Sequence, residues 1–509
     1  MALLPGSAFV FLQVPPIWRD HDSLAQIAAP PGHVNLLQFP PLYPFLARVP
    51  ILLISGWTHL VEDRPLRMGV SQNVALNDGG VYILVAAQHL ALILALALFV
   101  VTAAKSWERR VLLILVALAT PVLFVGAHVV SSEALGIILM ICLVSIAVHL
   151  FQNSHRSDGP ALAAFGICLY LNIMTRHQSA VFAALLPLGY LFAFAGALVR
   201  QPRGALPTVP DPGRAHWWRK AWRAILVGVA AILLANGTTR VLCAVFGEPY
   251  RSTVSRTAIY RFDKVDRLPA PEREAFIQEL QSKTDDPITK EAIPRLLEVK
   301  GYWGTSMAEL ERLIKKHRPP MTAKERKKLV DDYLNEICTL YFRAAPPFLV
   351  ENIRNAIRRG LTRSTAEEVA RAFVNGGVAS LQFYRTNRGR GVRTAHLATC
   401  SPEAEARIAA FAAHGWFGGI NQVPSGFVLL GSALAAAGLA FFKRFRGSLL
   451  ILILAIAVTN LLLVVGTFAF ASYSSRQVLP ECVFAFVALS LVLAGAFPPR
   501  TPAERPATQ

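Results

Sequence analysis

The chain has 509 residues, of which 54% are hydrophobic and only 16% are charged. The apolar residues form blocks of about twenty, each long enough to cross the roughly 30 Å of a bilayer core, which excludes a soluble globular protein. The blocks are continuous rather than alternating, which excludes a transmembrane β-barrel. The net charge of +19 does not indicate nucleic-acid binding, because membrane proteins gather Lys and Arg in cytoplasmic loops and near anionic head groups.

The first part of the chain is apolar but irregular. Residues 1–18 are short, contain three prolines and have no basic n-region, so they make a poor signal peptide. We interpret them as a broken or truncated first span. Residues 46–61 are a further apolar stretch, which we expect to be interfacial or re-entrant rather than spanning.

Between these stretches lies a segment with two acids. Asp20 and Asp22 flank His21, and the stiff sequence "FPPLYPFL" follows at 39–46. We expect residues 19–78 to form the first outer loop of the protein.

The hydropathy pattern then predicts a series of membrane spans with approximate ends. With the weak first segment the count is nine or ten. The nine clear spans are 79–104, 111–129, 133–151, 159–174, 179–199, 221–246, 423–442, 448–470 and 479–497.

The short loops predict the orientation. The loops near 105–110, 200–223 and 443–446 are rich in Lys and Arg, and the positive-inside rule assigns them to the cytoplasm. The alternate loops face out, together with the long polar segment 247–422. That segment can be basic and still be translocated, because the rule applies to short loops.

The polar segment 247–422 carries helical signals. Thr322 and Glu325 form a capping-box pattern before an apolar periodic run. The sequence "PPFLVENIRNAIRRGL" (346–361) is amphipathic, which suits either a helix lying flat on the membrane or one packed on its own domain. We therefore predict an N-terminal membrane module over 1–246, a polar domain over 247–422, C-terminal spans over 423–497 and a disordered tail over 498–509.

Two arginines depart from the charge pattern. Arg176 and Arg476 lie in outward-facing loops that otherwise lack positive charge, each within a few residues of a span. A charge at that depth is costly and usually has a partner or a ligand, and the guanidinium group suits bidentate binding of phosphate. The alternative is that each side chain reaches lipid head groups or a nearby acid.

Acidic residues are predicted at the same membrane face. Glu133 begins a span at its outer end, where it could simply complement the helix dipole with Ser131 or Ser132 as N-cap. Glu133, Asp20 and Asp22 are therefore predicted at the same membrane face as the two arginines. One acid could act as general base while the arginines stabilise a departing phosphate. This combination would support a transfer reaction with a phosphate leaving group.

Other chemistry has weaker support. His128 and His177 lie near the same face, but histidines of this kind are more often satisfied structurally. With His21 they could bind a divalent metal, although no ligand spacing supports a metal site. No nucleotide-binding motif is present. We therefore expect no cofactor, with a divalent metal as the minor alternative.

Four stretches in order resemble the GT-C glycosyltransferases, of the protein O-mannosyltransferase and aminoarabinose transferase type (families 39 and 83). They are the acidic "DS" at 22–23 with "FPPLYPFL", then "SEALGIILMICL", "MTRHQSAVFAALLPLGYL" and "SSRQVLPECVFAFVALSL". Family members carry adjacent acids, Asp-Glu, followed by a Tyr, whereas this chain has Asp-His-Asp-Ser.

The resemblance implies a fold and a set of roles. Members transfer a sugar from a polyprenyl-phosphate donor on the exoplasmic face. The catalytic acid matches Asp22 best, with Asp20 as its neighbour, and the donor-phosphate arginine matches Arg476. Arg176 and Glu133 match motif positions with less settled roles. The remaining supporting residues are His128, His177, Gln178 and Tyr43.

We therefore expect an all-α integral membrane protein, with a GT-C-like bundle of about nine or ten transmembrane helices and a mainly helical exoplasmic domain. It would be a multi-pass glycosyltransferase of the inner (plasma) membrane. Its partners would be a polyprenyl-phosphate-linked sugar, a lipid, glycan or protein acceptor and membrane lipids, but no nucleic acid. The alternatives are a transporter or flippase of an anionic or lipid-linked substrate, and a membrane subunit that binds lipid-linked sugars without chemistry. No paired halves support the transporter.

Overall fold

The computed structural model describes most of the chain and leaves several loops and both termini undescribed. The described residues are 2–19, 27, 40–55, 64–66, 70–72, 76–153, 159–199, 212–246, 265, 268–298, 303–344, 346–362, 365–386, 397–441, 447–470 and 475–496. Their regular secondary structure is helical apart from one antiparallel hairpin, β1 (Arg64–Leu66) and β2 (Val70–Gln72). The predicted all-α class is therefore confirmed in all but this detail.

Within the described residues, six helical stretches are long and apolar enough to cross a membrane, so the chain is a multi-pass membrane protein. The 3₁₀ helix η1 continues into α10 and forms one of them. The elements involved are α5 (Asp78–Ala103), α8 (Ser132–Gln152), η1 (His177–Ala184) with α10 (Leu185–Val199), α11 (Pro212–Val245), α21 (Gly447–Phe470) and α22 (Ser475–Ala496).

The count is lower than the predicted nine or ten, for two physical reasons. The predicted span 111–129 is broken into α6 (Trp107–Leu118) and α7 (Pro121–His128), bent by 59°. Pro121 starts α7, and proline disfavours helical backbone in the residue before it. If this pair is one broken span, the count is seven.

The other reason is length. Helices α9 (Gly159–Ile173) and α20 (Ser425–Phe441) are apolar but have only 15 and 17 residues. At 1.5 Å per residue they measure about 23 and 26 Å, less than the roughly 30 Å of a bilayer core.

The N-terminal apolar stretches form short helices, and their expected position in the membrane stays a prediction. Helix α1 (Leu4–Gln13) ends just before two prolines, and α4 (Leu42–Ser55) has Pro50 inside it. Ile17 forms a parallel bridge with Val129, which places the residues after α1 beside the start of α8.

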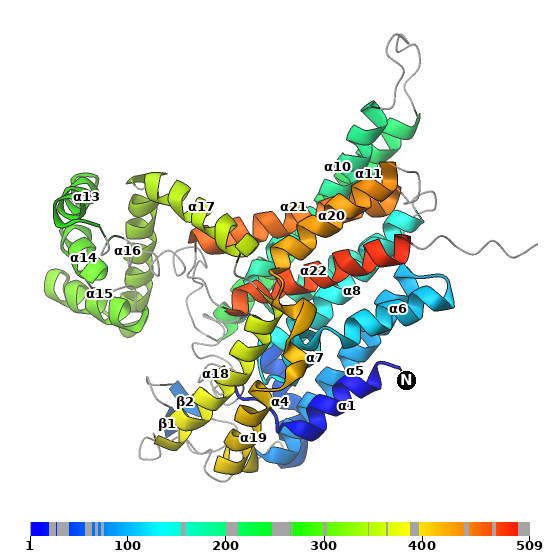
Figure 1. Cartoon of the computed structure of the whole chain (residues 1–509). Helices are drawn as coiled ribbons and strands as arrows, with labels where there is room; N and C mark the ends of the chain where they lie inside the picture. The colour runs from blue at the N-terminus through cyan, green and yellow to red at the C-terminus, as the bar shows by residue number, and fades with distance from the viewer. Residues whose placement is uncertain are drawn as a thin grey trace, which may run out of the picture.

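The polar segment 247–422 divides into two parts rather than forming one domain. Helices α13 (Ala270–Ser282), α14 (Pro287–Glu298), α15 (Trp303–His317) and α16 (Ala323–Ala344) enclose a hydrophobic core of their own. Figure 1 shows these four helices standing apart from the bundle. The predicted capping box of α16 is confirmed, because the Glu325 backbone N–H donates to Thr322 Oγ1 and the Thr322 N–H donates to Glu325 Oε2.

The rest of the polar segment belongs to the bundle. Helix α18 (Ala366–Thr386) contacts α7 and α22, and α19 (Pro402–Ala412) packs on α18. Three short 3₁₀ turns complete it, namely η4 (Ala398–Cys400), η5 (Gly415–Phe417) and η6 (Gly419–Gln422). Buried residues of α18 and α19 are part of the same core as the membrane helices.

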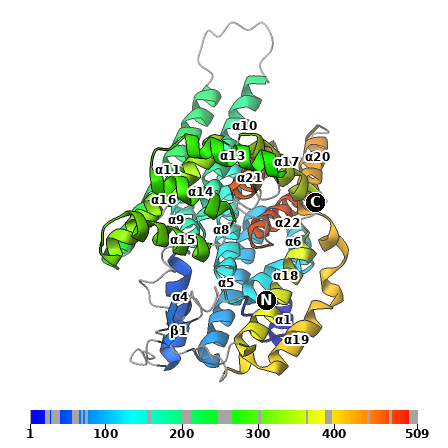
Figure 2. The ribbon, with the colours of Figure 1, turned by 90° about the vertical axis from the view of Figure 1, so that its left-hand side faces the viewer.

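Helix α17 (Pro346–Thr362) connects the two parts. It contacts mainly α21 and α20, and α16 only slightly, so it does not pack on the α13–α16 domain. Figure 2 shows α17 beside the upper part of α20. The close approach depends on glycine, because a Cβ on Gly426 of α20 would lie 2.7 Å from the carbonyl oxygen of Gly360.

Candidate functional site

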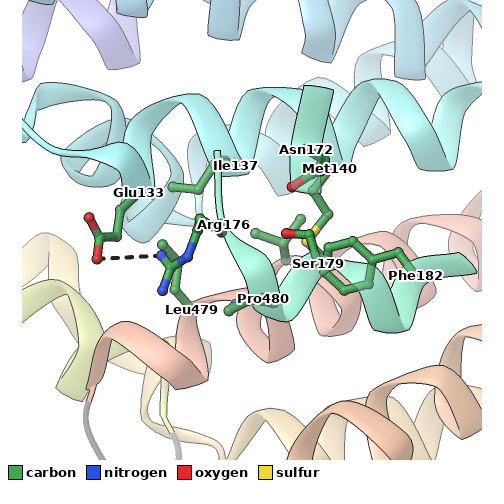
Figure 3. Close-up of a pocket in the computed structure, with 11 residues that line it drawn as sticks. Glu133, Ile137, Met140, Asn172, Arg176, Ser179, Phe182, Leu479 and Pro480 are labelled. Carbon is green, nitrogen blue, oxygen red and sulfur yellow. Dashed lines mark ion pairs between the residues drawn. The ribbon is translucent and has the colours of Figure 1, made fainter. Parts of the chain in front are cut away.

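A buried carboxylate lies between two arginines at the start of α8. Glu133 follows the first residue of that helix and its side chain is fully buried. Its Oε1 accepts a hydrogen bond from Nη1 of Arg19 at 2.8 Å and lies 3.4 Å from Nη1 of Arg176. Figure 3 shows the ion pair with Arg176. We call Arg19, Glu133 and Arg176 the Glu133 cluster.

Local backbone structure brings the three residues together. Arg19 follows the stretch that is hydrogen-bonded to the end of α7 through Ile17. Arg176 precedes η1 in an extended conformation, and its backbone N–H donates to the carbonyl oxygen of Asn172 at 2.8 Å. Gly136 gives the Arg176 side chain room, since a Cβ there would lie 3.0 Å from Cδ of Arg176.

The surroundings of the cluster are largely apolar. The guanidinium carbon of Arg19 lies 5.3 Å from the ring centre of Phe373 on α18, within the range of a cation–π contact. The side chains of Arg19 and Arg176 are 11% and 12% exposed. The cluster combines two cations with one anion, so its three side chains sum to +1. Such a group in a low-dielectric place attracts an anion more strongly than the same charges would in water.

A small pocket lies against Arg176. Its free volume is about 10 Å³, close to the minimum for a single water molecule. Asn172 lines it, and neither Oδ1 nor Nδ2 of that side chain has a hydrogen-bond partner among the described residues. Leu479, Pro480 and Val483 close the other wall, so the first turns of α22 lie beside the cluster (Figure 3).

The predicted arginine of α22 begins the same helix. Arg476 lies in the first turn of α22, but its side chain is outside the described part of the chain. Asp20 and Asp22 are likewise outside the described residues, although Arg19 directly precedes them. The structure thus brings Glu133, Arg176 and the start of α22 together, and the roles assigned to Asp20, Asp22 and Arg476 stay predictions.

His128 belongs to a different network. Its Nε2 lies 3.1 Å from the carbonyl oxygen of Val14, its Nδ1 lies 2.9 Å from Nε2 of His89, and Nδ1 of His89 lies 3.0 Å from Oγ of Ser7. The backbone carbonyl can only accept, so the chain is consistent if each histidine is neutral with its proton on Nε2. His128 therefore links α1, α5 and α7, and it does not line the pocket beside Arg176.

The other supporting residues also lie off the pocket wall. The Tyr43 hydroxyl donates to Oε1 of Gln88, whose Nε2 donates in turn to the carbonyl oxygens of Ala127 and Val129. Tyr43 therefore ties α4 to α5. His177 and Gln178 begin η1 as half-buried side chains, and neither lines the pocket around Arg176.

Sequence reasoning missed two residues of the site. Arg19 stands beside two acids, and its partner Glu133 is 114 positions away, so no local pattern reveals the pairing. Asn172 had a usable signal, because it is a lone amide inside the apolar run "CLYLNIM". Within the described residues no group of three His, Cys, Asp or Glu side chains could hold a metal ion.

Comparisons with protein-family models, with curated proteins and with solved structures found no match for this chain. The fold and the site define its class as a multi-pass helical membrane protein with a buried arginine–glutamate–arginine cluster.

Proposed function

We propose that the chain is an integral membrane glycosyltransferase of the GT-C class, which moves a sugar from a polyprenyl-phosphate donor to an acceptor on the exoplasmic face. The observation that carries this proposal is the Glu133 cluster beside the first turn of α22. Glu133, Arg176 and the start of α22 meet there, and each belongs to a stretch that resembles the GT-C enzymes. Arg19 joins them from outside those stretches.

The arginines suit a phosphate leaving group. Breaking the bond between sugar and phosphate leaves negative charge on the phosphate oxygens, and guanidinium groups held in place beforehand stabilise that charge without reorganisation. Glu133 holds Arg19 and Arg176 in position. Arg476, at the start of α22, would supply a third cation to the same phosphate.

The acids suit the acceptor. Asp22 would take the proton from an acceptor hydroxyl while the hydroxyl oxygen attacks the sugar carbon, so the electron pair of the broken bond leaves with the phosphate. Neighbouring guanidinium groups favour the ionised form of a carboxylic acid. Asp20 would orient Asp22 or bind the acceptor.

The chain direction of the spans supports an exoplasmic site. Helices α5, α8 and α22 and the η1–α10 span all begin at the end of the bundle where the cluster lies, and the basic stretches near 105–110 and 200–223 follow the other ends of α5 and α10. The α13–α16 domain would lie on the same side of the membrane and would shape the acceptor side of the site.

Two substitutions test this function once the product is known. Mass spectrometry of glycolipids and cell-surface glycans, with and without the gene, identifies the transferred sugar. In purified protein Asp22→Asn should then lower transfer by about 10²–10⁴-fold. Arg176→Gln should lower it by about 10²–10³-fold while Arg19 still pairs with Glu133.

Asp20→Asn is the matched control and should lose less activity than Asp22→Asn. Size-exclusion profiles establish that each variant is folded. Undiminished transfer in Asp22→Asn would overturn its role as base. Movement of a lipid-linked sugar across the membrane without any new glycosidic bond would favour the flippase.

A further inference from the structure

A second cavity lies on the other side of α22 from the Glu133 cluster. It has a volume of about 250 Å³ and is enclosed by α17, α20, α21 and α22. Leu479, Pro480 and Val483 of α22 face the Arg176 pocket, whereas Glu481 faces this cavity. The volume approaches the roughly 300–1,000 Å³ of small-molecule sites.

Two polar side chains interrupt its apolar wall. Glu481 is 1% exposed and Asn460 of α21 is 5% exposed. Oδ1 of Asn460 accepts no hydrogen bond from the described residues. Such an orphaned acceptor is unfavourable in an apolar place, and a ligand that donates a hydrogen bond would satisfy it.

The cavity opens toward lipid. Leu430 of α20 and Leu461 of α21 line it and are also 47% and 45% exposed on the outside of the bundle. Ile357 and Gly360 of α17 cover one end. Glu481 lies six residues, about 9 Å, into α22, so this part of the cavity is within the span. A ligand would therefore enter from the membrane.

The donor and acceptor chemistry selects the ligand. Oδ1 of Asn460 can only accept, and an ionised Glu481 would also only accept. A phosphate head group offers acceptors rather than donors, so it would leave Oδ1 of Asn460 unsatisfied. A hydroxyl head group can donate a hydrogen bond to Oδ1 of Asn460 without bringing a charge into the cavity.

We propose that this cavity binds a membrane amphiphile made of a single hydrocarbon chain with a hydroxyl head group, of the monoacylglycerol type. Its hydroxyl donates to Oδ1 of Asn460, and its chain lies along α20 and α21 toward the exposed leucines. The site differs in place and chemistry from the phosphate site proposed above, and it does not depend on that function.

Photolabelling of the full chain tests the proposal. The protein is placed in phosphatidylcholine nanodiscs, because that head group has no hydrogen-bond donor, and labelled with a diazirine-bearing monoacylglycerol. Peptides from α20 and α21 should carry the label. Unlabelled monoacylglycerol should compete for it, and an alkyl phosphate of equal chain length should not.

Variants locate the head group. Asn460→Leu should raise the monoacylglycerol concentration needed for half-competition about five- to tenfold, as expected for one lost hydrogen bond. Thr459→Val is the matched control. Thr459 is equally buried, and its hydroxyl has no partner among the described residues, but it does not line the cavity. This variant should compete like the wild type.

Three results would overturn the proposal. They are equal competition by the alkyl phosphate, unchanged competition in Asn460→Leu, and label spread evenly over all spans. If Asn460→Leu does not fold, Ala457→Phe fills the cavity from the same helix and should abolish labelling of α20 and α21. Labelling that persists in this variant would also overturn the proposal.

Discussion

Two acidic residues of this protein each pair with more than one basic side chain. Glu133 lies inside the membrane bundle, and Glu291 lies on the α13–α16 domain. Glu133 is fully buried between Arg19 and Arg176. Glu291 accepts hydrogen bonds from Arg295, Lys316 and His317 at 2.8 to 3.0 Å, but its side chain and theirs are 23% to 56% exposed.

The chemistry of the two clusters is nearly the same and their surroundings are opposite. Around Glu291 water can replace any lost partner, so each ion pair contributes little to stability. Glu133 is shielded from bulk water, so a lost partner leaves a buried charge uncompensated. Burial, rather than the number of ion pairs, should therefore decide how much each acid matters.

The largest predicted effect is at the buried acid. Glu133→Gln leaves two arginines side by side without their shared carboxylate, and we expect a loss of about 3–5 kcal/mol in stability. Thermal unfolding in detergent micelles, followed by size exclusion, measures this loss. Glu291→Gln is the matched control. Similar unfolding temperatures for the two variants would contradict the comparison.

An intermediate effect is expected at Asp78, which is half-buried. Its carboxylate accepts from the backbone N–H groups of Ala398 and Thr399 and from Oγ1 of Thr399, and so ties η4 to the start of α5. Asp78→Asn removes the charge from these hydrogen bonds and should destabilise this contact by about 1.5–3 kcal/mol. Faster hydrogen exchange at 398–400 is the expected sign, and unchanged exchange would show that the contact is weak.

The smallest effect is predicted at Glu291 and depends on pH. Hydrogen bonds from His317, and next from Lys316, lower the pKa of the Glu291 carboxyl from 4.5 to about 2. Because the folded-state pKa is depressed, its stabilisation is present above pH 4.5 and is lost as the pH falls toward 2.

Hydrogen exchange in α14 and α15 between pH 5 and pH 2 tests this. Protection in the wild type should fall across that window. Glu291→Gln should start slightly lower and change less. An identical pH profile in the two proteins would show that the ion pairs around Glu291 do not stabilise the domain.

Six of the nine clear spans were predictable, because their hydropathy and length both mark helices that can cross a membrane. The break at Pro121 could have been predicted from proline chemistry, but the continuous apolar run over 111–129 concealed it. The division of 247–422 was not predictable in the same way. Helix α18 carries an amphipathic pattern like those of α14–α16. Only the tertiary contacts distinguish a helix packed on the bundle from one packed in a separate domain.

Two residues of the candidate site could be predicted from the sequence, but the contacts between its residues could not. Arg176 departed from the charge pattern of its loop and Glu133 is an acid at the outer end of a span, so both could be singled out. Their contact with each other and with Arg19 depends on how separate spans pack, which no spacing in the sequence encodes. Glu481 shows the same limit, since an acid after Pro480 is visible in the sequence but its place in a lipid-facing cavity is not.

The residues just after α1 have consequences for the order of assembly. Trp18 donates a hydrogen bond to Thr399, and Arg407 donates to the carbonyl oxygens of Leu12 and Gln13, nearly 400 positions along the chain. During synthesis the N-terminus leaves the ribosome first, yet these partners are made when most of the chain is already in the membrane. Arg19 can therefore reach its final position only late, so Arg19, Glu133 and Arg176 would come together in one of the last steps of folding.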